Sequence, residues 1–340
     1  GKPPVMKFQS YHKQLKAGYV VYADFETILQ PCHDPGHSKT KKLTEHIPCG
    51  FGYALVRDDH ELIKHFVYRG EDCVEVFFKH MKQIGILVKE IFEEDVGPVD
   101  NERDWTDFLN AINCHICGKP LENDRVYDHD HRSGKFRGAA HVVCNLNYQQ
   151  QRKVPIVLHN FKNYDAAIIV QGLKYYDGEG INIIPSTSER FMSVICDNFY
   201  FIDSYQFLNS SLSDLVENLL ICDRDSNPFE DQKQKMQLFY QVFTEQRGID
   251  LLLKKGMYHD IYLLCDVLLL ASVFKNFRDI TLNNFQLDPV HYYSYPGCCY
   301  DAALKMTGVE LELITDIDQI NMITSGIRGG ISTIPTRYAS

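Results

Sequence analysis

The chain of 340 residues is long enough to bury one large core or two modest ones, and its 44% apolar and 24% charged content is ordinary for a globular protein. A net charge of −10 argues against a protein that coats nucleic acid nonspecifically, but it allows a carboxylate-rich metal site beside a local basic strip. Eleven scattered cysteines favour a reducing, intracellular compartment over a disulfide framework. No apolar run predicts a membrane span, and because the chain does not begin with Met we expect a piece excised from a longer protein.

The first predicted element is a buried strand over residues 19–29, rich in β-branched and aromatic residues. Asp24 and Glu26 are two apart, so they project from the same face of this strand. Two neighbouring acids on a buried strand repel each other and are costly to desolvate unless a cation shares them. A pair of divalent metals clamping a phosphodiester is the commonest chemistry that needs such a pair. The alternative is a strand end whose acids are solvated or paired with Arg, and the two residues alone do not decide.

Further strands of the same sheet are expected over residues 50–56 and 62–68, joined by a hairpin turn at 57–60. Helical spacing of apolar residues then predicts an amphipathic helix over 71–94 that covers the sheet. A second, short helix is expected over 105–112.

The stretch that follows has the spacing of a zinc site. Cys114 and Cys117 form a C-x2-C pair, and His141 and Cys144 form an H-x2-C pair, with an intervening length that suits a β-hairpin. A unit this small has almost no apolar core, so one structural Zn²⁺ would supply much of its folding free energy.

Between these pairs the sequence reads D-H-D-H, then R-G, then C-N directly after the last zinc cysteine. This pattern resembles the His-Me finger of recombination endonuclease VII-like nucleases, a small zinc-bound ββα module. The resemblance implies that Asp128 and Asn145 hold one Mg²⁺, that His129 is the general base, and that His131 and Arg137 contact DNA near the scissile phosphate. The alternative is that the finger survives only as a structural or DNA-binding insert. One departure is His141, where the phage enzymes carry Cys, and zinc accepts either ligand.

After the finger, a strand over 154–158 leads through a turn to Asp165, where a helix is expected to begin. A carboxylate at such a junction lies at the carboxyl edge of a sheet, where α/β proteins bind ligands, although a lone Asp there is more often a helix cap. A further strand is expected over 199–204 and a capped helix over 211–220. The stretch 221–255 gives no legible pattern.

A long helix is expected from residue 258 to 274. Tyr262 and Asp266 are four apart and share one of its faces. The pair fits either a hydrogen-bonded core contact or a metal ligand with a phenol that orients water.

In chain order these motifs read D-x-E, then N-x3-Y-D, then Y-x3-D. The order resembles the DEDDy 3′→5′ exonuclease of family B DNA polymerases, which has a ribonuclease H-like fold. Additional motifs at Ser211–Leu215 and Gly326–Gly330 are similar to the protein-primed branch, including polymerases of Maverick/Polinton-like elements that carry an endonuclease VII-like finger. The resemblance implies that Asp24, Glu26, Asp165 and Asp266 bind two Mg²⁺ or Mn²⁺ ions and that Tyr262 orients the attacking water.

The same resemblance implies that the frayed single strand is held by residues from three segments: His159, Asn160, Tyr164, Ser211 and Leu212. The segment between Leu220 and Tyr258 is shorter than in such relatives, where it carries a catalytic lysine, so we assign none. Because this sequence contains no palm with paired aspartates, we expect that it does not polymerise DNA.

We therefore expect an α/β exonuclease domain in two halves, 1–112 and 151–290, interrupted by a finger module at 113–150 and followed by the start of a polymerase region at 291–340. The expected partners are single-stranded and primer-template DNA, a terminal protein and the missing palm, with no membrane; a nucleus or a viral replication compartment would suit them. Two other hypotheses stay open. The finger could nick DNA with one Mg²⁺, or the chain could be an inert, zinc-dependent DNA-binding piece.

Overall fold

The structure is a computed structural model that describes residues 4–32, 44–94, 96–99, 101–178, 180–187, 190–221, 225, 227–243 and 257–327. The chain divides into two compact units, one of Ser10–Tyr300 and one of Gly1–Gln9 with Asp301–Ser340. The glycine pair that ends the predicted Gly326–Gly330 motif and part of the stretch 221–255 lie outside the described residues. None of the described helices is long and apolar enough to cross a membrane.

The larger unit is built on a seven-stranded mixed sheet with strand order β4-β3-β2-β7-β10-β9-β8. Strand β2 pairs antiparallel with β3 and parallel with β7, so the chain enters the sheet at its centre. The strands are β2 (Tyr19–Pro31), β3 (Thr44–Arg57), β4 (Leu62–Arg69), β7 (Val154–Leu158), β8 (Asn182–Pro185), β9 (Phe191–Ile195) and β10 (Phe199–Asp203). This confirms a mixed α/β protein.

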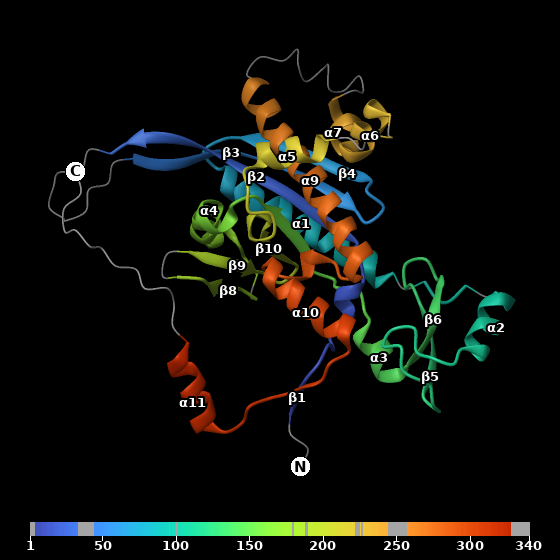
Figure 1. The fold of residues 1–340 in the computed structure, drawn as a ribbon. Helices are drawn as coiled ribbons and strands as arrows, with labels where there is room; N and C mark the ends of the chain where they lie inside the picture. Colours follow the sequence, from blue (N-terminus) through green and yellow to red (C-terminus); the bar gives the residue numbers. More distant parts are fainter. Residues whose placement is uncertain are drawn as a thin grey trace. The chain divides into compact units, whose positions relative to one another are not determined.

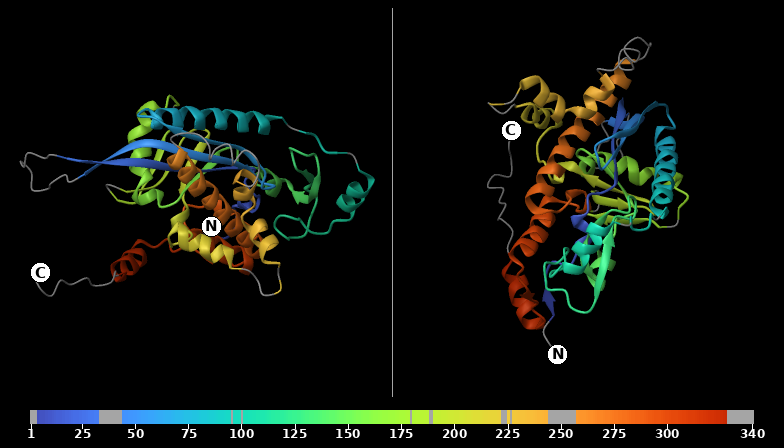
Figure 2. Two further views of the ribbon diagram at one scale, coloured as in Figure 1. Left: turned by 90° about the horizontal axis from the view of Figure 1, so that it is seen from above. Right: turned by 90° about the vertical axis from the view of Figure 1, so that its right-hand side faces the viewer.

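One face of the sheet is covered by α1 (Cys73–Glu93) and α4 (Asp165–Gly172), and the other by α9 (Met257–Phe285), as Figure 2 shows from above. The face toward α1 holds a dense aromatic core in which Phe25, Phe51 and Phe77 pack against one another. On the opposite face α9 lies so close that a Cβ at Gly52 would come 3.1 Å from Leu263. The sheet therefore has both faces buried, as a mostly parallel centre requires.

Helix α9 forms a buried ion pair with Asp288, which follows the helix, and Asp288 connects it to the segment before β2. The Arg278 guanidinium donates to Asp288 through Nε at 3.0 Å and Nη2 at 2.6 Å, and Asp288 also accepts the backbone N–H of Ala17 at 2.8 Å. Both charged side chains are almost fully buried. Burial alone would make either charge costly, so the pair holds only because each group satisfies the other.

The finger lies in the same unit. Strands β5 (Arg125–His129) and β6 (Phe136–His141) form the expected hairpin, and α3 (Val142–Asn147) completes a ββα module, with α2 (Glu102–Asn110) beside it. Helix α2 begins before the predicted residue 105, because the Asn101 side chain accepts the N–H of Arg103 and caps the helix there.

Several elements lie outside the predicted helices and strands. They are the hairpin β8–β9, the helices α6 (Pro228–Lys235) and α7 (Gln237–Phe243), and the short 3-10 turns, including η1 (Tyr11–Gln14). The expected helix over 211–220 is α5 (Leu212–Leu220), and the hydroxyl of Ser211 caps it by accepting the N–H of Asp214. The helix expected over 258–274 is α9, which continues to Phe285.

The smaller unit contains a two-stranded pairing of β1 (Val5–Met6) with β11 (Leu311–Glu312) and the helix α11 (Ile317–Gly326). Helix α10 (Tyr295–Thr307) contains the boundary between the units. This boundary is drawn from packing alone, and the four domains expected from the sequence stay predictions.

Candidate functional site

The predicted carboxylates meet at the carboxyl edge of the central parallel pair of strands. Strand β7 pairs with β2 at Val21 and Tyr22, so Asp24 and Glu26 follow just beyond the last paired residues. Asp165 is the first residue of α4, which follows the loop after β7. Asp266 lies on α9, which packs against β2. Elements distant in sequence thus bring four acids to the edge where α/β folds bind ligands.

The geometry of three of these acids fits a metal site. One carboxylate oxygen from each of Asp24, Glu26 and Asp266 lies within 4.8 Å of the others. Burial, followed by the charges of Asp165, Asp266 and Glu26, raises the pKa of Asp24 well above its usual range. Within the described residues, no Lys, Arg or His side chain forms an ion pair with Asp24, Glu26 or Asp266.

Asp165 is buried in surroundings that disfavour its charge. It is 2% exposed, and its Oδ1 atom is buried without a hydrogen-bond partner among the described residues. Burial is the main cause that raises its pKa to about 8; a hydrogen bond from its own backbone N–H opposes this shift, and the charges of Asp203 and Glu26 add to it. A helix cap would have its carboxylate satisfied by backbone N–H groups. The free oxygen and the clustered acids instead fit a divalent cation, which takes carboxylate oxygens as ligands.

Tyr262 stands beside this cluster at the surface. Its side chain is 52% exposed, so the alternative of a buried core pair with Asp266 is wrong for the phenol. The charge of Asp266 is the main cause that raises the pKa of Tyr262, and the two side chains are hydrogen-bonded. The phenol therefore keeps its proton and can donate it toward a carboxylate or a water molecule.

The residues predicted to hold DNA have varied surroundings. The ring of His159 is bound on both sides, by the Ser204 hydroxyl at 2.9 Å from Nδ1 and by the Ser210 carbonyl at 3.1 Å from Nε2. Asn160 has a φ of 63° and its side chain accepts the amide of Asn163 at 2.7 Å. These two residues shape the loop before Asp165, and their contact with DNA stays a prediction.

Tyr164, directly before α4, contacts strands β2 and β3. Its hydroxyl bonds the Thr27 hydroxyl and lies 2.9 Å from Nδ1 of His46, whose ring meets the tyrosine ring edge-on at 5.5 Å. Thr27 follows the metal-ligand candidate Glu26, and Tyr164 precedes Asp165. The hydrogen bond therefore fixes the spacing between two of the four carboxylates.

A groove opens on the other side of the cluster, between α5 and α9. Its volume is about 770 Å³, and its walls are mainly aliphatic, with Leu212, Val216 and Leu269 among them. Tyr262 and Asp266 also line it, so the groove leads directly to the carboxylates. Ser211 caps α5 and stands next to this wall.

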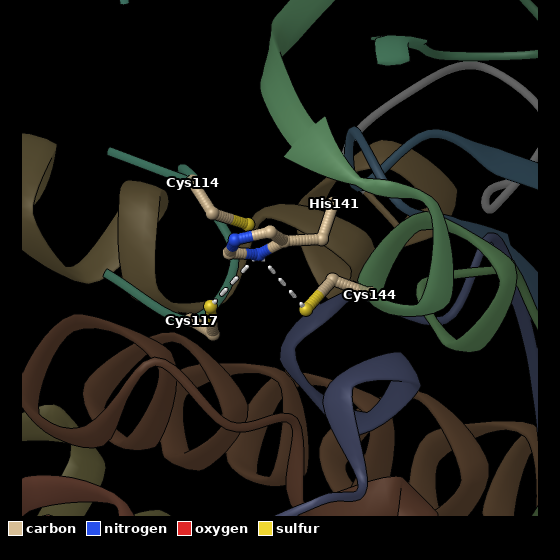
Figure 3. A group of neighbouring side chains, drawn as sticks. All are labelled: Cys114, Cys117, His141 and Cys144. Carbon is tan, nitrogen blue, oxygen red and sulfur yellow. Dashed lines mark hydrogen bonds between the residues drawn. The ribbon is translucent and has the colours of Figure 1, made fainter. Parts of the chain in front are cut away.

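The zinc site is assembled as the spacing predicts. Figure 3 shows Cys114, Cys117, His141 and Cys144 converging, and one ligand atom of each lies within 4.8 Å of the others. The Nδ1 atom of His141 lies 3.4 Å from Sγ of Cys117 and 3.7 Å from Sγ of Cys144. A tetrahedral zinc with ordinary bond lengths would separate such ligand atoms by about 3.6 Å.

The surroundings of His141 support the same ligand assignment. Its Nε2 lies 2.9 Å from the Pro120 carbonyl, which can only accept, so Nε2 carries the proton and Nδ1 is left free to bind a metal. The cluster is packed by Ile116 and Ala140, with Tyr11 from η1 against it. These four residues form a fitting zinc site.

The predicted magnesium ligand of the finger is already satisfied. Asp128 is 1% exposed and accepts from Arg137 through Nε at 2.9 Å and Nη2 at 2.6 Å, and it lies 2.8 Å from Nε2 of His115. Gly138 makes room for this arrangement, because a Cβ there would lie 2.6 Å from the His115 ring. Asp128 would have to exchange these partners to bind a metal.

The other finger residues are arranged around this pair. The Nε2 atom of His129 is buried and has no hydrogen-bond partner among the described residues, and its ring lies 4.6 Å from that of His131. Asn145 lies in α3 directly after the zinc ligand Cys144. The catalytic and DNA-binding roles of His129, His131, Arg137 and Asn145 stay predictions.

Residues 92–166 match the family model of recombination endonuclease VII. The matched range holds all four zinc-site residues, the D-H-D-H run and Asn145, and ends one residue beyond Asp165. The match supports a nuclease-like, DNA-processing role and DNA binding for this part of the chain. No curated protein and no solved structure matches the chain. The polymerase resemblance and the ribonuclease H-like fold therefore stay predictions.

Two residues that the sequence did not predict, Asp203 and Arg132, hold loops of the candidate sites in place. Asp203 is fully buried at the end of β10 and accepts the N–H groups of Lys162 and Tyr205 at 3.1 and 3.0 Å, which anchors the loop before Asp165. Arg132 pairs with Asp58 in the β3–β4 turn and lies over the ring of Phe92, which fastens the D-H-D-H loop to the sheet. The signal that could have found Asp203 is an acid at the end of a predicted strand.

Proposed function

We propose that this chain is a metal-dependent DNA nuclease whose carboxylate cluster hydrolyses the terminal phosphodiester at a 3′ end. The observation that carries the proposal is the set of four acids around β2, with Asp165 buried and one of its oxygens unpaired. Protein groups among the described residues do not neutralise this charge. A pair of divalent cations would, and two cations clamping a phosphate is the arrangement that phosphodiester hydrolysis uses.

In this proposal Asp24, Glu26, Asp165 and Asp266 hold Mg²⁺ or Mn²⁺, which supplies an activated water and stabilises the leaving oxygen. The hydroxyl of Tyr262 keeps its proton and orients the attacking water, since the charge of Asp266 raises its pKa. The Thr27–Tyr164 hydrogen bond keeps the strand that carries Glu26 at a fixed distance from Asp165. Asp203 holds the preceding loop in place.

The groove between α5 and α9 supports action at a strand end. Its aliphatic walls suit a sugar and base rather than a phosphate, and Glu217 on its rim disfavours a second phosphate. A terminal nucleotide placed there would set its phosphate against Asp266. The order of the acidic motifs further supports an origin in the exonuclease region of a protein-primed family B DNA polymerase, with DNA as the partner.

The test uses 5′-labelled single-stranded DNA with Mg²⁺ or Mn²⁺. We expect a ladder that shortens from the 3′ end and disappears in Asp266→Asn. Asp260→Asn is the matched control, because it removes an acid from the same helix that pairs with Arg69 away from the cluster. Unchanged degradation by Asp266→Asn, or equal loss in both variants, would refute the assignment.

The match over residues 92–166 favours a second candidate, in which the finger nicks DNA with one Mg²⁺. His129 would be the base, and its unpartnered Nε2 is compatible with that role. The ion pair of Asp128 with Arg137 weighs against it, because the carboxylate must first be released. Closed circular DNA separates the sites: nicking abolished by His129→Ala but retained by Asp266→Asn would belong to the finger.

A further inference from the structure

Strands β2 and β3 run on beyond the sheet as a two-stranded ribbon, defined here as residues 27–31 and 44–48. Their register continues from Thr27 opposite Pro48 to Pro31 opposite Thr44, past the last pairings with β7 and β4. Figures 1 and 2 both show the ribbon projecting away from the remaining strands. The ribbon begins one residue after the metal-ligand candidate Glu26.

The two faces of the ribbon are distinguishable from the register. The irregularity beside Glu26 lies on β3, where Cys49 is the extra residue, so β2 keeps its alternation. Asp24, Glu26 and Ile28 therefore project from one face. Ile47 stands opposite Ile28 and shares that face.

The other face has different neighbours. It carries Thr27, which bonds Tyr164, and Leu29, whose cross-strand partner His46 also bonds Tyr164. Ile28 is 59% exposed and Leu29 is 60% exposed, so two adjacent aliphatic side chains of equal exposure lie on opposite faces.

Ile28 and Ile47 form an exposed aliphatic step on the face that carries two of the carboxylates. A DNA strand whose terminal nucleotide lies in the groove beside Asp266 must leave the carboxylate cluster on another side. The face of β2 that carries Glu26 leads from the cluster to this step. The ribbon carries one carboxylate, Glu45, and no Lys or Arg, so it does not suit phosphates, and its apolar side chains are left to contact bases.

We propose that the Ile28–Ile47 step binds the bases of single-stranded DNA upstream of the phosphate at the carboxylate cluster. This inference rests on the proposed exonuclease function and adds a binding surface to it. Contact through apolar side chains would be tolerant of sequence, because every base offers an apolar face. The proposal predicts that long substrates gain affinity from the ribbon while a dinucleotide does not.

The experiment compares Ile28→Ser with Leu29→Ser in the full chain, on a long single strand and on a dinucleotide. Both residues are exposed, so neither change is expected to unfold the protein. We expect Ile28→Ser to raise the KM for the long DNA strand about fivefold. This is the effect of losing one aliphatic contact that becomes partly buried when DNA binds. Its kcat/KM on the dinucleotide should stay unchanged, and Leu29→Ser should match the wild type on both substrates.

The outcomes separate this inference from the function beneath it. If the wild type hydrolyses both substrates and Ile28→Ser leaves the KM of the long strand unchanged, the step binds something other than DNA, such as a protein, and the inference is refuted alone. An equal effect of Leu29→Ser refutes it too, because the faces would not differ. If the wild type hydrolyses neither substrate, the proposed function fails and takes the inference with it.

Discussion

Replacing Asp165 by Asn should stabilise the protein in the absence of divalent metal. The carboxylate is buried, its pKa is raised to about 8, and one oxygen has no partner among the described residues. The unfolded chain ionises this group near its ordinary pKa of about 3.9, so at pH 7 the fold gives up about 4 kcal/mol by keeping it protonated. Asn has nearly the same shape and carries no such penalty.

A smaller loss opposes this gain. The Asn side chain still buries a polar group where one oxygen lacks a hydrogen-bond partner among the described residues, and an unsatisfied buried polar group costs about 1–3 kcal/mol. The net gain should therefore be about 1–3 kcal/mol at pH 7 after relaxation. The sign with pH follows from the raised pKa: the contribution of Asp165 to wild-type stability is fully present below about pH 4 and is lost as pH rises toward 8, since the unfolded state releases the proton first. The advantage of Asp165→Asn should thus grow from pH 5 to pH 8.

Urea unfolding with a chelator that spares zinc, at pH 5 and pH 8, measures this difference, and repeating it with Mn²⁺ measures metal binding. The wild type should be stabilised by Mn²⁺ and the variant should not, because binding to the folded state alone raises stability. Asp214→Asn is the matched control, an acid in the first turn of α5 whose pKa is lowered by its hydrogen bonds to Ser211 and Ser210. A variant Asp165→Asn that is less stable than the wild type at both pH values would refute the reasoning.

Three further changes have outcomes set by single contacts. Removing zinc with a strong chelator, or Cys117→Ser, should unfold the finger and shift the fluorescence of the single tryptophan, Trp105, which packs 4.7 Å from a ring of β5; an unchanged spectrum would deny zinc its folding role. Arg278→Met should cost about 3–5 kcal/mol in urea unfolding by leaving Asp288 charged, buried and unpaired, and a loss below 1 kcal/mol would contradict this. Tyr262→Phe should lower kcat about 10- to 100-fold while Mn²⁺ still stabilises the fold, and loss of that stabilisation would make the phenol structural instead.

The sequence predicted those parts of the site that depend on local periodicity. Residues two apart on a strand share a face, which paired Asp24 with Glu26, and residues four apart on a helix share a stripe, which paired Tyr262 with Asp266. The spacing of the zinc residues likewise required only a hairpin between two short turns. Asp165 was found because strand-to-helix junctions recur at sheet edges.

Contacts made by the tertiary fold were beyond such reasoning. The residues around Asp203 do not indicate that it anchors the loop before Asp165, because Lys162, whose N–H it accepts, lies 41 residues upstream. Nor does the D-H-D-H motif indicate that Arg137 and His115 close on Asp128. The hairpin β8–β9 was missed because its strands, of 4 and 5 residues, are too short to show a clear alternation.

Asp128 and Asp165 are buried equally, at 1% and 2% exposure, yet their electrostatic states are opposite. Asp128 has a bidentate guanidinium and an imidazole against it, so its charge is satisfied without a metal. Asp165 has other carboxylates against it and an unpaired oxygen. A divalent cation therefore relieves a cost at the carboxylate cluster, whereas at the finger it must replace partners of comparable strength. Under the proposed function, we therefore expect Mg²⁺ or Mn²⁺ to bind where β2, α4 and α9 meet, and the finger to need only zinc for its fold.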